Sequence, residues 1–275
     1  MKKRRADVAL YEDLNLESIA LARALIMEGR AFCGDNRIMS ASEGVREGAQ
    51  LRVKGALDPY VSRGAHKLKR ALEVFNIDLV GRACVDVGSS TGGFTDVMLR
   101  AGAAHVCCVD VGYNLLDYRL RSDPRVTVLE RTNARHLTPE HFDVQPDFGA
   151  TDVSFISLKA VLPVVLPLLG GRREFVALVK PQFEAAKEDV GAKGVVRDPE
   201  VHRRVLADML DFAASTQWAA AGLDYSPVRG PEGNIEFLLH LLPRADGYAD
   251  VPERAINDII SLAYDKFFKS TKEGL

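Results

Sequence analysis

Short apolar runs alternate with longer amphipathic segments from about residue 60 onward. The runs occupy residues 83–87, 105–109, 126–129, 148–153, 175–179, 222–228 and 235–242. This alternation predicts strands joined by crossover helices, which is the pattern of a mostly parallel, doubly wound sheet. The last two runs are separated by a segment too short for a crossover helix, so we expect a terminal antiparallel hairpin. The sequence therefore predicts an α/β domain with a seven-stranded sheet.

The first 54 residues have a different pattern and are expected to form a small α+β unit. The predicted elements are helices at Ala6–Asp13 and Ser18–Glu28 and short strands at residues 30–33 and 50–53. Residues 55–60 contain glycine and proline and are typical of a linker. We therefore expect a first domain at residues 1–54 and a second at residues 61–275.

Composition indicates a soluble globular protein. The chain has 275 residues, 47% of them hydrophobic and 27% charged, which is enough to bury a sizeable core. No apolar run reaches the length of about 18 residues that spans a bilayer. The basic start at Lys2–Arg5 is followed by acidic residues instead of an apolar segment, so no secretory signal is expected. We therefore expect the protein in the cytoplasm.

Charge and cysteine usage narrow the chemistry further. A net charge of -2 means that any RNA binding must depend on local basic patches. The four cysteines show no Cys-x-x-Cys spacing and lie mostly in apolar runs, which favours buried, reduced thiols. The histidines are scattered along the chain. We expect no metal site.

A glycine-rich turn, Asp86–Asp96, follows the first apolar run of the larger domain. Glycines allow a tight turn and close approach to a ligand, and an acidic residue at a strand end accepts hydrogen bonds from an amine or hydroxyl. The spacing Asp-x-Gly-x-x-x-Gly is not that of dinucleotide sites and suits the loop that holds the methionine end of S-adenosylmethionine (SAM). The alternative is a turn without a ligand. The predicted contacts are Asp86, Gly88, Ser89, Ser90, Thr91, Gly92, Gly93 and Phe94, the last of which needs only to pack beneath the loop.

Polar residues also follow the next apolar runs. Asp110 ends the second run about 20 residues downstream, where Rossmann-like folds place a carboxylate on ribose hydroxyls. Asn133 follows the third run, near the expected position of the adenine. Asp152 ends the fourth run and would lie at the same edge. An ordinary turn or cap is the alternative at each position.

Several sequence blocks together resemble the TlyA family of ribosomal RNA 2′-O-methyltransferases, also called hemolysin-like. These enzymes are related to the FtsJ methyltransferases and carry an N-terminal S4 domain. The blocks are Ser62–Leu68, Asp86–Asp96, Asp110–Tyr113, Glu130–Arg135, Thr151–Leu158, Leu178–Glu184 and Gly233–Glu236. The resemblance implies a Rossmann-like methyltransferase fold, SAM as cofactor, and ribosomal RNA or ribosomal subunits as partner. It further implies methylation of a ribose, by family that of a cytidine.

The resemblance also implies a catalytic tetrad, and the matching residues are Lys67, Asp152, Lys180 and Glu236. Asp152 and Lys180 each end an apolar run, so both are expected at the carboxyl edge of the sheet. Lys180 would stabilise the developing alkoxide or accept the proton, while Lys67 would orient the ribose or phosphate. The pattern alone leaves open which lysine is the base. It also leaves open a solvated basic face for Lys67, a turn cap for Asp152, and a strand carboxylate with a cationic partner for Glu236.

The first unit matches the S4 layout through Arg5-x-Asp7 and a second helix that ends at Gly29. It departs from that pattern at Ile19 and Leu21, where S4 domains carry basic residues, and at Cys33-Gly34 instead of Asn-Gly. Phosphate contacts are therefore expected from other basic residues. In the first unit these are Lys2, Lys3, Arg4, Arg5, Arg23, Arg30 and Arg37, and in the larger domain they are Arg63 and Lys69.

Three kinds of function stay open from sequence. The first is the ribosomal RNA 2′-O-methyltransferase, which needs both lysines and the S4-like unit. The second is a SAM-dependent methyltransferase that acts on a small molecule or a protein, which needs neither Lys67 nor a basic patch. The third is a protein without catalytic activity, either an RNA-binding assembly factor or a membrane-active hemolysin. The missing spanning segment argues against the membrane-active version.

Overall fold

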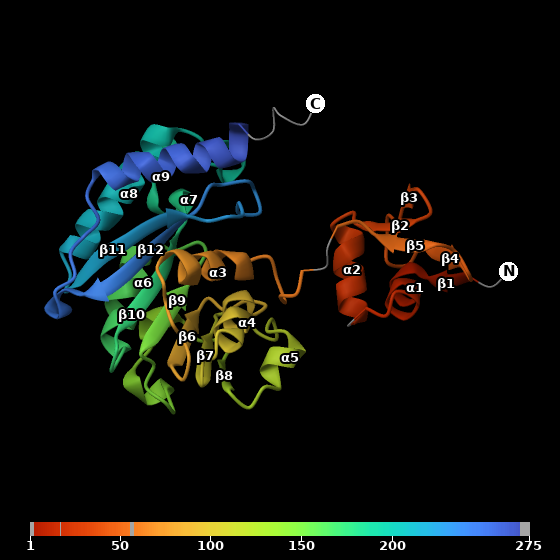
Figure 1. Cartoon of the computed structure of the whole chain (residues 1–275), viewed down its shortest axis with the longest axis horizontal. Helices are drawn as coiled ribbons and strands as arrows, with labels where there is room; N and C mark the ends of the chain where they lie inside the picture. Colours follow the sequence, from red (N-terminus) through yellow and green to blue (C-terminus); the bar gives the residue numbers. More distant parts are fainter. Residues whose placement is uncertain (1–2, 17, 56–57, 270–275) are drawn as a thin grey trace. The chain divides into compact units, whose positions relative to one another are not determined.

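The computed structural model describes residues 3–16, 18–55 and 58–269. The chain divides into two units, residues 1–59 and 60–275 (Figure 1). Lys2 of the expected basic tail and residues 56–57 of the expected linker lie outside the described residues. Each unit is described by itself below.

The first unit packs two helices against two small sheets. Its elements are β1 (Lys3–Arg5), α1 (Ala6–Asp13), α2 (Ile19–Met27), β2 (Ala31–Cys33), β3 (Asn36–Arg37), β4 (Gly44–Arg46) and β5 (Leu51–Val53). Strand β1 pairs with β4, and β2 lies between β3 and β5. The expected helices and the strands β2 and β5 are confirmed. Strands β1, β3 and β4 were not predicted, because two or three mostly polar residues give no periodic signal.

The second unit alternates strands and helices along most of its length. Its main elements are α3 (Ala65–Val74), β6 (Ala83–Val87), α4 (Gly93–Arg100), β7 (His105–Val109), α5 (Tyr118–Arg121), β8 (Val126–Leu129), β9 (Phe148–Thr151), α6 (Leu158–Val165), β10 (Glu174–Val179), α7 (Pro181–Glu184), α8 (Pro199–Ala214), β11 (Trp218–Tyr225), β12 (Phe237–Pro243) and α9 (Arg254–Tyr264). A π-helical turn, Asp265–Lys269, follows α9.

These strands form one seven-stranded sheet in the order β11-β12-β10-β9-β6-β7-β8. Neighbours from β10 to β8 are parallel, and β12 is antiparallel to both β10 and β11. The expected parallel sheet with a terminal antiparallel hairpin is confirmed. Several boundaries were wrong. Strand β9 ends at Thr151, two residues earlier than expected, and β12 begins at Phe237, so Glu236 belongs to the loop before that strand. Strand β11 also begins earlier than expected, at Trp218.

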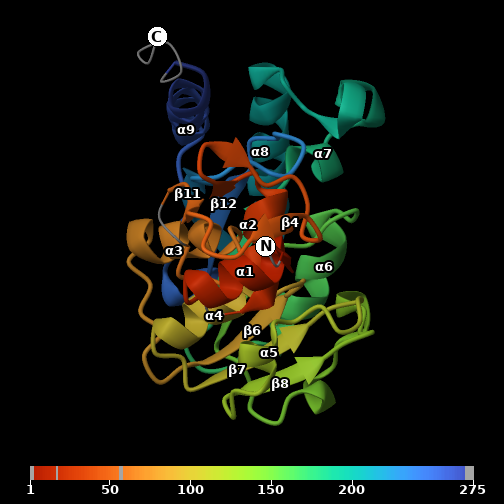
Figure 2. The ribbon, with the colours of Figure 1, turned by 90° about the vertical axis from the view of Figure 1, so that its right-hand side faces the viewer.

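Helices cover both faces of this sheet. Helices α3, α4 and α5 pack on one face around Leu68 and Met98, and α6, α8 and α9 pack on the other around Leu162 and Met209. Figure 2 shows α3 and α4 on one side of the strands and α6 and α8 on the other.

The buried strands tolerate little change in side-chain volume. A Cβ atom on Gly149 of β9, for example, would lie 2.4 Å from the Phe175 ring of β10.

The strand order reverses at β6. From β6 the chain continues outward through β7 and β8, and then returns to place β9 and β10 on the other side of β6. Open α/β sheets bind ligands outside the carboxyl ends of the strands at such a reversal. The fold therefore points to the crevice between the ends of β6 and β9.

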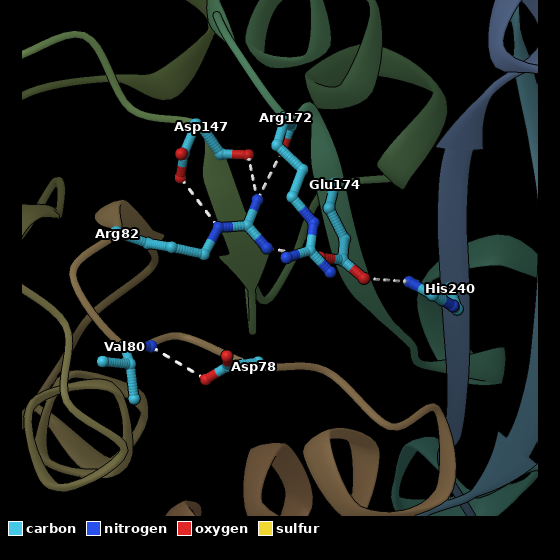
Figure 3. Close-up of polar contacts among 7 residues, drawn as sticks. All are labelled: Asp78, Val80, Arg82, Asp147, Arg172, Glu174 and His240. Atoms are coloured by element: carbon cyan, nitrogen blue, oxygen red, sulfur yellow. Dashed lines mark hydrogen bonds and ion pairs between the residues drawn. The ribbon is translucent and has the colours of Figure 1, made fainter.

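The opposite edge of the sheet carries a buried ionic network, drawn in Figure 3. Arg82, directly before β6, donates to Asp147 Oδ1 at 2.9 Å, to the backbone oxygens of Asp147 and Arg172, and to Glu174 Oε2. Glu174 Oε1 lies 2.8 Å from His240 Nε2. Burial alone would raise the pKa of Glu174, but the hydrogen bonds with His240 and Arg82 outweigh it and lower the pKa. This network ties the amino ends of three parallel strands to β12.

Three of the four cysteines lie in the core as free thiols. Cys84, Cys107 and Cys108 are free and buried, and Cys33 is partly exposed. Burial raises the pKa of Cys84 and Cys107 to about 12, so these thiols stay protonated near neutral pH. Within the described residues, no three histidine, cysteine or acidic side chains are arranged to hold a metal ion. No helix in that part of the chain is long and apolar enough to cross a membrane.

Candidate active site

Two connected cavities open at the carboxyl ends of β6, β7, β9 and β10. The larger has a volume of about 480 Å³, and its lining includes Gly88, Ser90, Asp110, Asn133, Asp152 and Phe155. The smaller has a volume of about 230 Å³, and its lining includes Ser62, Lys67, Asp86, Ser89, Thr91 and Lys180. Gly88, Ser90, Asp152 and Ser154 line both cavities. One elongated ligand can therefore extend from the larger cavity into the smaller.

Asp86 lines the smaller cavity from within β6 and is fully buried. Its Oδ2 accepts hydrogen bonds from the Thr95 backbone N–H at 2.9 Å and the Thr95 hydroxyl at 2.6 Å. Its Oδ1 has no hydrogen-bond partner among the described residues. Burial raises the pKa of Asp86 to about 7. A ligand amine in the smaller cavity would supply the missing partner.

The glycines of this loop have different roles. Gly88 has φ +83°, and a Cβ atom there would lie 3.1 Å from the Asp152 carbonyl oxygen. A Cβ atom on Gly93 would lie 2.4 Å from Ser62 Oγ. Gly92, expected to contact the cofactor, does not appear in the lining of either cavity. It adopts φ +96° before α4, where a Cβ atom would lie 2.3 Å from Leu120 Cδ1. Glycine is thus needed at position 92 because a side chain would strain the backbone and clash with Leu120.

The predicted ribose and adenine contacts both line the larger cavity. Asp110 also accepts hydrogen bonds from the backbone N–H groups of Ser90 at 2.8 Å and Gly112 at 2.7 Å. Asn133 Oδ1 accepts one from the Arg135 N–H at 3.0 Å. Asp110 and Asn133 therefore also stabilise local turns, as the alternative interpretation of each residue predicted. Phe94 lines the smaller cavity and packs into the core beneath it.

The four tetrad residues lie in one cluster of ion pairs. Lys67 Nζ is 2.8 Å from Glu236 Oε2 and 3.1 Å from Asp152 Oδ2. Lys180 Nζ is 2.6 Å from Asp152 Oδ1 and donates to the Ser154 hydroxyl oxygen at 2.8 Å. The sheet explains this convergence: Thr151 pairs with Ala177, and Val179 pairs with Phe237. The residues that follow β9 and β10 and precede β12 therefore meet at one edge.

Burial and ion pairing have opposite effects on the charges in this cluster. The side chains of Lys67 and Lys180 are each 9% exposed, and that of Glu236 is 1% exposed. Burial opposes the charge on Lys67, but Asp152 and Glu236 outweigh it and raise the pKa of Lys67. Burial likewise opposes the charge on Asp152, but Lys67 and Lys180 lower its pKa. Burial raises the pKa of Glu236. Lys67 is thus held as an ammonium ion between two carboxyl groups.

Three neighbours of the tetrad were not assigned a role from sequence. Ser154 accepts from Lys180 as described above. Phe155 is 91% exposed, has φ +64° and packs 5.2 Å from the Phe183 ring. Glu184 accepts hydrogen bonds from the Ser157 hydroxyl at 2.6 Å and the Leu158 N–H at 2.7 Å. These contacts join the loops after β9 and β10, which carry Asp152 and Lys180. No spacing rule in the sequence marks such cross-loop pairs.

Replacing Glu184 by alanine should therefore destabilise the protein by about 1–3 kcal/mol, because two hydrogen bonds at a partly buried carboxylate are lost. The measurement is urea-induced unfolding at neutral pH. Glu188→Ala, at an exposed position four residues further on, is the matched control and should change the unfolding free energy little. Equal unfolding free energies for the two variants would contradict the contribution assigned to the hydrogen bonds of Glu184.

The residues expected to contact RNA are found in two settings. Arg4 pairs with Glu12 and Asp13, and Arg5 and Arg23 both pair with Asp7, which is fully buried. Hydrogen bonds from Arg5, acting against burial, hold the pKa of Asp7 well below its usual range. The side chains of Arg5 and Arg23 are each more than half exposed. In the second unit, Lys69 pairs with Glu73, whereas Arg63 is exposed and makes no ion pair with a described residue.

Known proteins are similar to this chain in sequence and fold. The model of the FtsJ-like methyltransferases matches residues 60–242. A candidate rRNA methyltransferase of Bacillus subtilis, YqxC, is 46% identical over 266 residues, covering 96% of this chain and 95% of its own. The 16S/23S rRNA (cytidine-2′-O)-methyltransferase TlyA of Mycobacterium tuberculosis is 48% identical over 205 residues, covering 72% of this chain and 76% of its own. A solved hemolysin-like protein from Streptococcus thermophilus is 40% identical with a TM-score of 0.79, covering 99% of both chains.

Proposed function

Because this chain belongs to the TlyA group of the FtsJ-like methyltransferase family, we propose that it methylates the ribose 2′-hydroxyl of a cytidine in ribosomal RNA, with SAM as methyl donor. The observation that carries the proposal is the buried cluster of Lys67, Asp152, Lys180 and Glu236 beside the two connected cavities. This arrangement combines a ligand site at the strand-order reversal with charged groups suited to an alcohol nucleophile.

The residues of the two cavities suit SAM in size and chemistry. The unpartnered Oδ1 of Asp86 would accept from the amine of the methionine part. Gly88 and Gly93 line the same cavity, at positions where a Cβ atom would clash with neighbouring protein atoms. Asp110 and Asn133 line the larger cavity, which would hold the adenosine part. When bound, SAM supplies a methyl group activated by a positively charged sulfur.

Within the tetrad, we assign different tasks to the two lysines. Lys67 lies between Asp152 and Glu236 and stays an ammonium ion, so it orients the ribose or a phosphate by donating hydrogen bonds. Lys180 has Asp152 as its carboxylate partner and lines the cavity wall. It acts on the attacking hydroxyl, either as an ammonium ion that stabilises the developing negative charge on the oxygen or as an amine that accepts the released proton. Asp152 holds both lysines in place.

Cofactor affinity should depend on pH through Asp86. Its pKa of about 7 in the free protein means that the carboxyl is partly protonated near neutrality. A cationic amine beside it favours the ionised form, so affinity should rise with pH, by up to about tenfold per unit below pH 7, and level off above it. The same raised pKa makes the free energy of unfolding of the cofactor-free protein fall as pH rises from about 4 to about 7.

Isothermal titration calorimetry with S-adenosylhomocysteine from pH 5.5 to 8.5 measures this dependence. Asp86→Asn keeps the shape of the side chain and removes its titration, so its affinity should be weaker at pH 8 and nearly independent of pH. A wild-type affinity that does not change across this range would contradict the assignment of Asp86 to the ligand amine.

The function itself is tested by incubating the purified protein with isotope-labelled SAM and unmodified ribosomal subunits. Modified positions are then mapped by primer extension at low nucleotide concentration, which pauses at 2′-O-methyl groups. A pause at a cytidine that depends on both protein and SAM supports the proposal. Binding of SAM without labelling of RNA would favour a small-molecule or protein substrate instead.

We extend the proposal to residues 1–54 as an S4-like RNA-binding domain. Its support is the pair of guanidinium groups of Arg5 and Arg23, which the buried Asp7 orients while leaving more than half of each side chain exposed. Loss of RNA binding in the double variant Arg5→Gln/Arg23→Gln, with unchanged binding of S-adenosylhomocysteine, is the expected result.

A further inference from the structure

A second group of cations lies near the tetrad, with Arg229 on the loop that leads into β12 and Arg197 on the segment before α8. Arg197 and Arg229 line a small cavity of about 100 Å³ together with Glu232, Tyr264 and Phe268. Both arginines are exposed. In the part of the chain that the structure describes, neither forms an ion pair, whereas arginines elsewhere in this unit do, Arg82, Arg203 and Arg244 among them. Two unpaired guanidinium groups at one cavity form a site for an anion.

Aromatic residues contact the side chain of Arg229 and the backbone of Arg197. The Arg229 guanidinium carbon lies 5.3 Å from the ring centre of Phe267 and 5.4 Å from that of Phe268. Phe268 packs on Tyr264, whose hydroxyl donates to the Arg197 backbone oxygen at 2.6 Å. An arginine packed on aromatic rings keeps its donors free at the edge of the guanidinium plane, where they can bind two oxygens of one phosphate.

The backbone next to Arg229 touches the tetrad. A Cβ atom on Gly230 would lie 2.7 Å from Glu236 Oε1, so this glycine packs directly against the tetrad carboxylate. Pro231 lines the smaller of the two cofactor cavities, and Glu232 lines the arginine cavity. Asn234 accepts from the Val196 N–H at 2.9 Å and donates to the Gly194 oxygen at 2.9 Å, which fixes the Arg197 loop to the same turn. The arginine cavity and the reaction site therefore lie on two sides of one short turn.

We propose that Arg197 and Arg229 bind a backbone phosphate of the substrate RNA, on a nucleotide adjacent to the one that is methylated. This inference rests on the proposed function and adds a phosphate contact beyond the tetrad and the S4-like unit. When the target ribose lies at Lys180, the RNA strand on either side of it must cross the neighbouring protein surface. The turn at residues 230–233 separates that ribose from the two arginines. Glu232 lines the same cavity as the arginines, and its carboxylate opposes an anion there, so the two guanidinium groups must outweigh it.

The test uses the full-length protein and a fluorescent ribosomal RNA fragment that the wild type methylates. Arg229→Gln and Arg197→Gln should each weaken RNA binding several-fold at low salt. Each should also reduce the slope of log affinity against log salt by about 0.7, the value for one phosphate contact on a single strand. The Michaelis constant for RNA should rise with little change in kcat, and the affinity for S-adenosylhomocysteine should stay the same. Arg229→Lys should recover part of the affinity, because charge returns without the bidentate geometry.

Arg254→Gln is the matched control. Arg254 is also exposed and forms no ion pair with a described residue, but it lies at the opposite end of α9 from Tyr264. Equal affinity and salt slope for the Arg229, Arg197 and Arg254 variants would overturn the phosphate site while leaving the methyltransferase proposal intact. A wild-type protein that methylates no RNA would instead overturn the proposed function, and this inference with it.

Discussion

Lys180→Met is expected to reduce the rate of 2′-O-methylation by about 10²–10⁴-fold, the range attributed to a positioned proton acceptor or charge stabiliser. Methionine has a similar length but carries no amine. The variant should still fold, because Asp152 keeps its ion pair with Lys67 and Glu184 keeps its hydrogen bonds with Ser157 and Leu158. The measurement is single-turnover methylation with saturating SAM, accompanied by a melting curve and a titration with S-adenosylhomocysteine.

Lys159→Met is the control for this experiment. Lys159 lies on α6 and pairs with Asp208 at the surface, away from both cavities. It should retain wild-type activity, since exposed ion pairs contribute little to stability. If Lys180→Met kept more than about a tenth of the wild-type rate, the role assigned to this lysine would be wrong, and Lys67 would become the residue to examine.

The second large effect is expected at the opposite edge of the sheet. Arg82→Met should lower the free energy of unfolding by about 3–5 kcal/mol, because Glu174 keeps a buried charge after losing its guanidinium partner. Arg82 and Glu174 are each 5% exposed, so water cannot replace the lost contact. Chemical unfolding monitored by circular dichroism measures the change.

Two comparisons make this prediction specific. Arg203→Met removes an arginine from an exposed pair with Glu200 on α8 and should cost less than about 1 kcal/mol. The double variant Arg82→Met/Glu174→Gln removes both charges and should be more stable than Arg82→Met alone. A loss below about 1 kcal/mol in Arg82→Met would show that the network contributes little to folding.

Local pattern was sufficient to predict most of the sheet. The runs that became β6, β7 and β8 were delimited correctly because apolar, β-branched residues end sharply at glycine, aspartate or glutamate. The same reasoning placed Glu236 inside a strand, although the strand begins one residue later. Periodicity cannot detect that boundary, because Ile235 is also buried and apolar.

Contacts between distant residues are the part that the sequence did not reveal. Arg82 and Glu174 are 92 positions apart, and each reads as an ordinary polar residue at the start of a strand. The pairing of Ser154 with Lys180 and the anchoring of Arg229 by Phe267 and Phe268 likewise depend on which loops the fold brings together. The cofactor loop was more accessible to sequence reasoning, because its chemistry is concentrated within a few consecutive residues.

The place of β12 between β10 and β11 has a consequence for how the protein is made. A chain emerging from the ribosome presents β10 first, a strand whose six residues are all buried in the finished sheet. Among the described strands, β11 pairs with β12 alone, so β10 keeps an open apolar edge until residue 243 has been synthesised. Glu236 arrives with the same segment. Translation thus closes the sheet and completes the tetrad in one late step, and nascent chains that stop earlier are prone to aggregate instead of acting as partial enzymes.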